Sequence, residues 1–198
     1  MKSLLPGIWE WSWFSEEKQL DFNGHVLAVG EHRILIDPPP MTPADFAFLK
    51  QGEAVDYILL TNRDHQREAE QFRQTFGCKI MAPDLDAKEM SVPIDKTYKD
   101  GELLPGGIWI VHLKNQKSPG ESALFLQKGK GVVIVGDALI GHPSGSLRLL
   151  PDEKYADITQ ARVGLRRILN FSFDALLVGD GTSIITNAKP AVQHLLGP

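Results

Sequence analysis

Four segments of this 198-residue chain place polar or acidic side chains where a run of apolar residues ends. Such a run is typical of a buried strand, and a carboxylate at its end must be solvated, hydrogen-bonded or bound to a metal ion to offset its loss of water. In a single turn the aspartate could simply bond backbone amides. Four such ends on neighbouring strands favour one shared polar cavity. The segments are Ile36–Asp37, the corner TNRDHQRE at 61–68, Gly136–Asp137 and Gly179–Gly181.

Nine segments show the pattern of β-strands, and they must hold these corners in place. Residues 8–14 alternate aromatic or apolar with polar side chains, which puts one set on each face of a sheet. The run at 55–61 is continuously apolar and predicts a strand buried on both faces. The turn KGKG at 128–131 joins two strands of a meander. The predicted strands are 8–14, 25–29, 33–36, 55–61, 78–82, 108–113, 122–127, 131–137 and 175–181.

Helices are expected between and after these strands. Thr42 can cap a short helix that begins at Pro43, after a proline run that ends the sheet ladder. A helix of about three turns follows the 61–68 corner and ends at Gly77, so it forms a βαβ-like unit with the strands on either side. Ligands of open α/β sheets bind at such strand-end corners, so function is expected there. The remaining helices are an amphipathic segment at 155–169 and a short one at about 189–196.

The composition limits the classes of partner. With 21 basic and 25 acidic residues, the chain has no basic stripe of the kind that binds a nucleic-acid backbone. Pro6 and Glu10 interrupt the apolar N-terminal segment, and no run approaches the length of a membrane span. Cys78 is the single cysteine, so it cannot form an internal disulfide, and core packing is its expected role. We therefore expect a cytoplasmic protein with a small-molecule ligand or substrate and no membrane contact.

Nothing along the chain marks a domain boundary. No linker, low-complexity segment or repeat interrupts the predicted elements, so residues 1–198 are expected to form a single domain of two sheets packed between helices. Trp9, Trp11 and Trp13 are spaced by two and so share one strand face. That face is expected to pack on the core or a helix, although three aromatic side chains at one edge could also form a homodimer contact.

Five segments of the chain, taken in order, resemble the metallo-β-lactamase superfamily. The opening hairpin NGHVLAVGEHRILIDPP ends in an aspartate as the family's hairpin does, and VDYILLTNRDH lies where its His-x-His-x-Asp-His loop would be. KSPGESALFL, VVIVGDAL and LLVGDG are similar to the family's three later site segments. The resemblance covers nearly the whole chain. It implies an α+β fold, a four-layer αββα sandwich, in which the family holds zinc ions.

The ligand positions that the resemblance assigns have mostly changed. Aligned on Thr61, they fall on Asn62, Asp64, Gln66 and Arg67, so no histidine survives. If the loop is two residues shorter, the pair Asp64–His65 is retained and Asn62 stands at the preceding histidine, and both registers stay open. Under either register the later positions are Glu121, Asp137 and Asp180, of which only Asp137, the bridging aspartate, is the family's residue.

The resemblance therefore implies a hydrolase with an altered metal site. Zinc is usually held by imidazole nitrogens in such sites, whereas oxygen donors suit magnesium, manganese or calcium better. We expect one divalent ion, either magnesium, manganese or zinc, and no dizinc centre. This ion would activate a water for hydrolysis of an ester or phosphoester, with Asp64 and His65 in the catalytic role. The expected metal ligands are Asp64, His65, Asp137 and Asp180.

A metal-free alternative stays open, in which the protein binds or senses a ligand without catalysis. An arginine supplies a fixed positive charge that replaces the electrostatic role of an ion, so Arg67 and Arg63 could pair with the strand-end acids. The inherited cavity would then recognise a small anionic molecule. The expected ligand-binding residues are Asn62, Arg67, Glu121 and, from the loop GHPSGS, His142.

Overall fold

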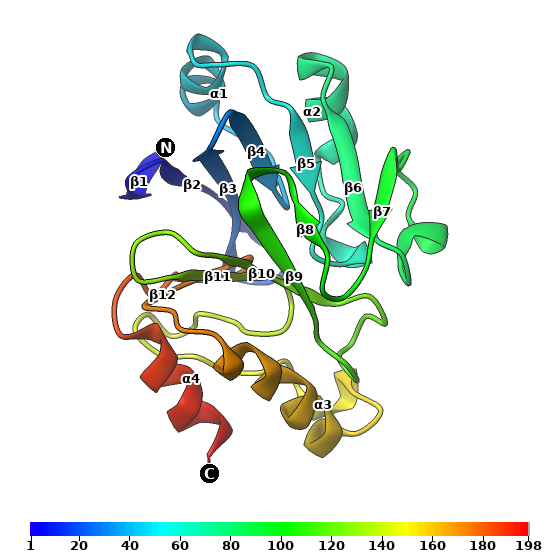
Figure 1. Ribbon diagram of the computed structural model, residues 1–198, viewed down its shortest axis with the longest axis vertical. Coiled ribbons are helices and arrows are strands. Elements are labelled where there is room, and N and C mark those ends of the chain that lie inside the picture. The colour runs from blue at the N-terminus through cyan, green and yellow to red at the C-terminus, as the bar shows by residue number, and fades with distance from the viewer. Residues whose placement is uncertain (198) are drawn as a thin grey trace.

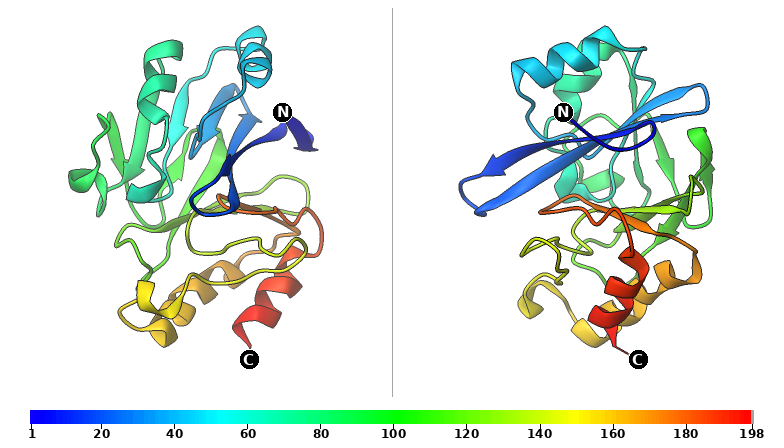
Figure 2. Two further views of the ribbon diagram at one scale, coloured as in Figure 1. Left: turned by 180° about the vertical axis from the view of Figure 1, so that it is seen from behind. Right: turned by 90° about the vertical axis from the view of Figure 1, so that its left-hand side faces the viewer.

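Two β-sheets pack face to face, and helices cover the outer face of each sheet (Figure 1). The computed structural model describes residues 1–197. The two further views in Figure 2 show the same succession of helices, sheet, sheet and helices. This order confirms the predicted αββα sandwich. The helices are α1 (Pro43–Gln51) and α2 (Ala69–Phe76) on the first sheet, and α3 (Ile158–Leu165) and α4 (Ala188–Leu196) on the second.

The first sheet has seven strands in chain order. The first four pair antiparallel as consecutive hairpins, and the last three run parallel to their neighbours, with helical connections between them. The parallel pairing of the strands around α2 confirms the predicted βαβ unit. The strands are β1 (Lys2–Leu5), β2 (Ile8–Ser15), β3 (Leu20–Val29), β4 (His32–Ile36), β5 (Tyr57–Leu59), β6 (Lys79–Pro83) and β7 (Lys96–Tyr98).

The second sheet has five strands in the order β12-β11-β10-β9-β8. Strands β8 to β11 pair antiparallel in sequence, which confirms the predicted meander. Strand β12 returns parallel to β11 after a long connection that contains α3. The strands are β8 (Leu103–Leu104), β9 (Ile108–His112), β10 (Ser122–Leu126), β11 (Val132–Val135) and β12 (Ala175–Val178).

Local signals set the ends of the helices. The Thr42 side chain accepts a hydrogen bond from the Asp45 amide, so α1 begins at Pro43 as predicted. Gly77 ends α2 in the left-handed conformation (φ 67°), where a side chain would cost more than glycine does. The predicted helix at 155–169 is shorter than expected, because the Asp157 side chain caps it at Ile158. Short 3-10 helices in the connections are η1 (Arg63–His65), η2 (Ala87–Glu89), η3 (Pro105–Gly107), η4 (Asp152–Lys154) and η5 (Arg166–Asn170).

The core between the sheets consists of aliphatic side chains from both. Leu27 and Ile36 of the first sheet and Leu124 and Leu177 of the second are fully buried in one cluster. Complete burial of one such side chain stabilises the fold by about 1.5–3 kcal/mol relative to exposure. This packing fixes the distance between the two sheets, and therefore between the corners at the ends of their strands.

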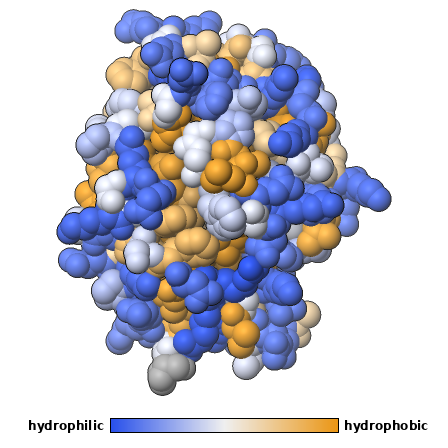
Figure 3. All heavy atoms as spheres, in the orientation of Figure 1, coloured by the Kyte–Doolittle hydropathy of each residue, from blue (hydrophilic) through white to orange (hydrophobic). Residues whose placement is uncertain are grey.

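Of the three N-terminal tryptophans, only one is fully buried. Trp11 packs against Phe72 of α2 and is 2% exposed, whereas Trp13, further along the β2–β3 hairpin, is 44% exposed. On the face shown in Figure 3, hydrophobic atoms gather over β8 and β9, where the cross-strand partners Leu103 and Trp109 are exposed. No helix within residues 1–197 combines the length and the apolar character needed to cross a bilayer.

Candidate functional site

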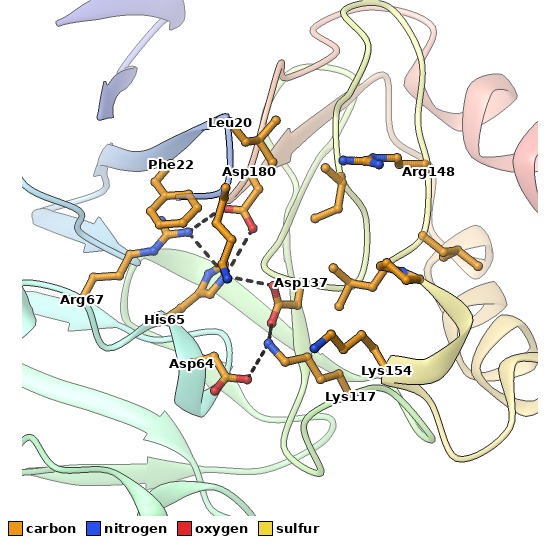
Figure 4. A pocket seen from close by; sticks show the side chains of 15 residues that line it. Leu20, Phe22, Asp64, His65, Arg67, Lys117, Asp137, Arg148, Lys154 and Asp180 are labelled. Carbon is orange, nitrogen blue, oxygen red and sulfur yellow. Dashed lines mark hydrogen bonds and ion pairs between the residues drawn. The ribbon is translucent and has the colours of Figure 1, made fainter. Parts of the chain in front are cut away.

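A cavity of about 420 Å³ lies where strand ends from the two sheets meet. The corner after β5 and the residues that follow β11 and β12 converge on it, as the sequence predicts, and Figure 4 shows their side chains together. The rest of the wall comes from the start of β3, the connection between β9 and β10, and the segment that precedes α3. The lining residues are Lys18, Leu20, Phe22, Asp64, His65, Arg67, Lys117, Asp137, Ile140, Arg148, Leu149, Leu150, Pro151, Lys154 and Asp180.

His65 lies at the centre of the strand-end acids. Its Nδ1 is 2.8 Å from Asp37 Oδ2, and its Nε2 is 3.5 Å from Asp137 Oδ1 and 3.8 Å from Asp180 Oδ2. Asn62 orients this corner, because its side-chain oxygen accepts hydrogen bonds from the backbone amides of Asp64 and His65. Asp37 therefore belongs to the polar cluster, but as a buried partner of His65 behind the cavity wall.

The glycines of the two Gly-Asp corners make room for this histidine. A Cβ atom on Gly179 would lie 2.5 Å from Cε1 of His65, and one on Gly136 would lie 2.3 Å from Oγ1 of Thr61. Real Cβ atoms are not found at such distances, so a side chain at either position would push the corner apart. The Gly-Asp pattern in the sequence thus has a steric cause as well as a polar one.

The environment of His65 favours the imidazolium form. Burial and the nearby Arg67 oppose a charged ring, but Asp37 and Asp137 more than offset them and raise the pKa of His65 to about 10. Both ring nitrogens then carry a proton. Nδ1 donates to Asp37, and Nε2 faces Asp137 and Asp180 at ion-pair distance.

Arg67 is held from several sides. Its Nη2 lies 2.7 Å from Asp180 Oδ1, and its Nη1 donates to the backbone oxygens of Asn23 at 2.9 Å and Asp37 at 3.2 Å. The guanidinium also lies over the Phe22 ring, 4.6 Å from its centroid. The predicted pairing of Arg67 with a strand-end acid is therefore present. Arg63, by contrast, pairs with Glu89 and does not line the cavity.

Lys117 bridges two of the acids. Its Nζ lies 2.9 Å from Asp64 Oδ2 and 2.8 Å from Asp137 Oδ2. Partial burial opposes the ammonium charge, but the two carboxylates outweigh it and raise the pKa of Lys117 above its ordinary value. Burial alone would raise the pKa of Asp137, but His65 and Lys117 together lower it well below its usual range.

The arrangement does not fit a resident divalent ion well. His65, Asp137 and Asp180 could each offer a ligand atom, and these atoms lie within 4.8 Å of one another. However, Lys117 already neutralises Asp137, Arg67 neutralises Asp180, and Arg67 Nη2 lies 3.4 Å from His65 Nε2. An ion there would have to displace these fixed positive charges, and the trio offers it one imidazole nitrogen only.

The structure places Asp64 apart from that trio. Asp64 lines the cavity but faces Lys117, while His65, the next residue, reaches Asp137 and Asp180. Of the two predicted catalytic residues, His65 alone therefore lies among the acids. Asp64 is not among the three side chains whose ligand atoms lie within 4.8 Å of one another, and its role as a metal ligand stays a prediction.

Three predicted ligand-binding residues do not line the cavity. Asn62 is fully buried and its side-chain oxygen caps η1, so it is not available to a ligand. Glu121 is also fully buried, and one of its oxygens accepts a bond from the Ala138 amide. Burial, with Asp137 nearby, raises the pKa of Glu121 well above its ordinary value, which favours the neutral acid. His142 is exposed on the loop after Asp137 and lies outside the lining.

Other cavity residues were missed at the sequence level. Lys117, Arg148 and Lys154 all line the wall, together with Lys18 of the β2–β3 hairpin. Lys117 had a detectable signal, since it begins the segment KSPGES, which also contains Glu121. Arg148 and Lys154 lie in a long connection without apolar periodicity, where the local sequence gives no direction to a side chain.

Comparison with solved structures shows the same fold. The DIM-1 metallo-β-lactamase exposed to ceftazidime has a TM-score of 0.74 at 14% identity, covering 98% of this chain and 94% of that one. BLEG-1, a B3 metallo-β-lactamase, has a TM-score of 0.71 at 20% identity, covering 96% of this chain and 100% of that one. TTHA1623 in a di-iron-bound form has a TM-score of 0.71 at 22% identity, covering 95% and 98%.

Comparison of the sequence gives the family directly. No curated protein matches the chain. The family model described as "Metallo-beta-lactamase superfamily" matches residues 1–197. Since that match extends over nearly the whole chain, the protein belongs to the metallo-β-lactamase superfamily.

Proposed function

We propose that the protein binds a small anionic molecule in its strand-end cavity, where Arg67 and Lys117 neutralise the cavity carboxylates in place of a metal ion. The observation that carries this proposal is the pairing of each cavity carboxylate with a fixed cation. Lys117 contacts Asp64 and Asp137, and Arg67 contacts Asp180. The acids are thus compensated from within the chain.

The charge of the cavity supports an anionic ligand. Five cationic side chains line the wall against three carboxylates, and His65 adds a further positive charge when protonated. The whole chain, by contrast, has a net charge of −4. A local positive excess inside an acidic protein attracts small anions to that place in preference to the rest of the surface.

A hydrolase with one divalent ion is the second candidate. The trio of His65, Asp137 and Asp180 favours it, because three potential ligand atoms lie close enough together to share an ion. The di-iron-bound form of TTHA1623 is a metal-bound structure with the same fold. In this chain, however, Arg67 and Lys117 would have to leave those acids before an ion could bind.

Metal analysis and thermal unfolding separate the two candidates. The protein is purified without chelators, analysed for bound metals, and heated with magnesium, manganese, zinc or inorganic phosphate. The proposal expects less than stoichiometric metal, no stabilisation by any divalent ion, and a rise in melting temperature with phosphate, since only a ligand that prefers the folded state has that effect. Stabilisation by manganese or zinc that disappears in the Asp137→Ala variant would favour the hydrolase instead.

A further inference from the structure

The two cations deepest in the cavity are already engaged. All contacts of the Arg67 guanidinium described above are with the protein, and the Lys117 ammonium lies between two carboxylates. A ligand anion that paired with either would have to compete with a protein carboxylate less than 3 Å away. The acidic group of a ligand is therefore expected to bind elsewhere on the wall.

Two cationic side chains on the opposite wall have no carboxylate partner among the described residues. Arg148 and Lys154 are exposed side chains that line the cavity, and within residues 1–197 neither pairs with a carboxylate. Figure 4 shows both on the side of the cavity that faces His65 and Arg67. In that view they lie at opposite ends of the wall, with the Lys154 side chain beside Lys117 and the Arg148 guanidinium well away from both, so one carboxylate or phosphate group pairs with one of them only. The planar guanidinium of Arg148 is the better partner, because it can bind a carboxylate or phosphate through two hydrogen bonds.

The backbone that holds these two side chains is anchored. The Arg148 amide donates to the Ile140 oxygen at 2.9 Å, and the Ile140 amide donates to the Arg148 oxygen at 2.9 Å. The Leu150 amide donates to the hydroxyl of the buried Tyr155 at 3.1 Å. The segment is thus held in place before a ligand arrives, which reduces the entropy lost on binding.

Between the engaged and the unpaired cations, the wall is apolar. Six lining residues have apolar side chains: Leu20, Phe22, Ile140, Leu149, Leu150 and Pro151. Leu20 and Phe22 come from the β2–β3 hairpin, whereas the other four come from the connection before α3. A volume of about 420 Å³ is within the range of small-molecule pockets, which are mostly apolar with a few placed polar groups.

We infer that the ligand is an amphipathic organic acid, whose anionic group binds Arg148 and whose apolar body lies along the wall formed by Leu20 and the 149–151 segment. This inference rests on the proposed function and moves the anion-recognition site away from Arg67 and Asn62. A bare inorganic anion would leave the apolar wall uncovered, and an uncharged apolar molecule would leave Arg148 without a partner.

Three probes of matched chemistry test the ligand class by isothermal titration. Octanoate has both the charge and the apolar body, 1-octanol has only the body, and acetate has only the charge. Each buried methylene contributes about 0.8 kcal/mol, so octanoate is expected to bind at least about tenfold more tightly than acetate. Because octanol lacks the negative charge, its affinity should also be at least about tenfold lower than that of octanoate.

Substitutions locate the two ends of the ligand. Arg148→Gln should weaken octanoate binding about fivefold or more and leave octanol binding unchanged, whereas Lys154→Gln, at the other end of the wall, should weaken octanoate binding less. Leu20→Gln should weaken octanoate but not acetate. Lys88→Gln and Leu103→Gln are the matched controls, because both residues are exposed and lie outside the cavity. The melting temperature of each variant confirms that it is folded.

The outcomes separate this inference from the proposed function. If acetate or phosphate binds as tightly as octanoate, the cavity is an anion site without selection for an apolar body, and only the inference fails. If octanol binds as tightly as octanoate and the Arg148 variant binds octanoate normally, the assigned anion site is wrong. If no anion binds at all, the proposed function fails with it.

Discussion

The Lys117 ammonium lies 2.8 Å from the carboxylate of Asp137, the acid that the sequence resemblance places at the bridging-aspartate position. The same ammonium reaches Asp64 at 2.9 Å. A side chain on the β9–β10 connection therefore holds two acids that would otherwise be available to a cation, and this contact leads to the first prediction.

Replacing Lys117 with methionine should create affinity for a divalent cation. Two opposite unit charges about 4 Å apart attract each other by roughly 4 kcal/mol near a protein surface. Removal of the ammonium therefore leaves Asp64 and Asp137 without a compensating positive charge, which favours binding of a cation. Manganese titration should show at least about tenfold tighter binding by Lys117→Met than by the unmodified protein. The control is Lys88→Met, an exposed lysine away from the cavity. Equal manganese affinity in all three proteins would contradict the prediction.

The Arg67–Asp180 pair should contribute strongly to stability, because both side chains are more than nine-tenths buried. Arg67→Met leaves the Asp180 carboxylate without its cation and is expected to cost about 3–5 kcal/mol of unfolding free energy. Adding Asp180→Asn removes the uncompensated charge and should restore part of that loss. Urea unfolding of the two single variants and the double variant measures this coupling, and strictly additive effects would show that the pair does not interact.

The imidazolium form of His65 should persist well above neutral pH. Its pKa of about 10 in the folded protein exceeds the ordinary value of 6.5. The stability that this shift contributes is fully present below about pH 6.5 and is lost as the pH rises through 10. Ring nitrogen shifts in NMR spectra should report two protonated nitrogens at pH 8. The difference in unfolding free energy between the protein and His65→Gln should shrink from pH 7 to pH 10.5. A ring that titrates near its ordinary pKa would refute the assigned environment.

A methyl group on Gly179 should disturb the site through His65. The added Cβ would lie 2.5 Å from Cε1 of the ring, and overpacking of this kind costs about 1–3 kcal/mol. Unfolding experiments should show that Gly179→Ala destabilises the protein and costs much less in a His65→Ala background, where the clashing ring is absent. If Gly179→Ala lowers the unfolding free energy equally in both backgrounds, the loss arises from the backbone at the end of β12 and not from the contact with the ring.

The sequence alone was sufficient for the order of elements and for the polar strand ends. Apolar periodicity, the cap at Thr42 and the left-handed stop at Gly77 are local properties, so they predict strands and helices without knowledge of distant residues. The strands β1, β7 and β8 were not predicted, because KSLL, KTY and LL form neither an extended apolar run nor a clear alternation of apolar and polar residues. The Gly-Asp pattern marked the polar strand ends, but the lack of space at Gly136 and Gly179 arises only when Thr61 and His65 pack against them.

Only the tertiary structure decided which side chains meet in the cavity. Arg67 and Asp180 are 113 residues apart and follow strands of different sheets, so their contact depends on how the two sheets pack. Lys117 and Asp137 are 20 residues apart within the second sheet, so their contact depends on how its strands pair. The choice of His65 over Asp64 as the neighbour of Asp137 and Asp180 depends on the turn of η1, which Asn62 sets with its side chain. Arg148 and Lys154 have no local signal at all, since only the folded connection before α3 directs them toward the strand ends.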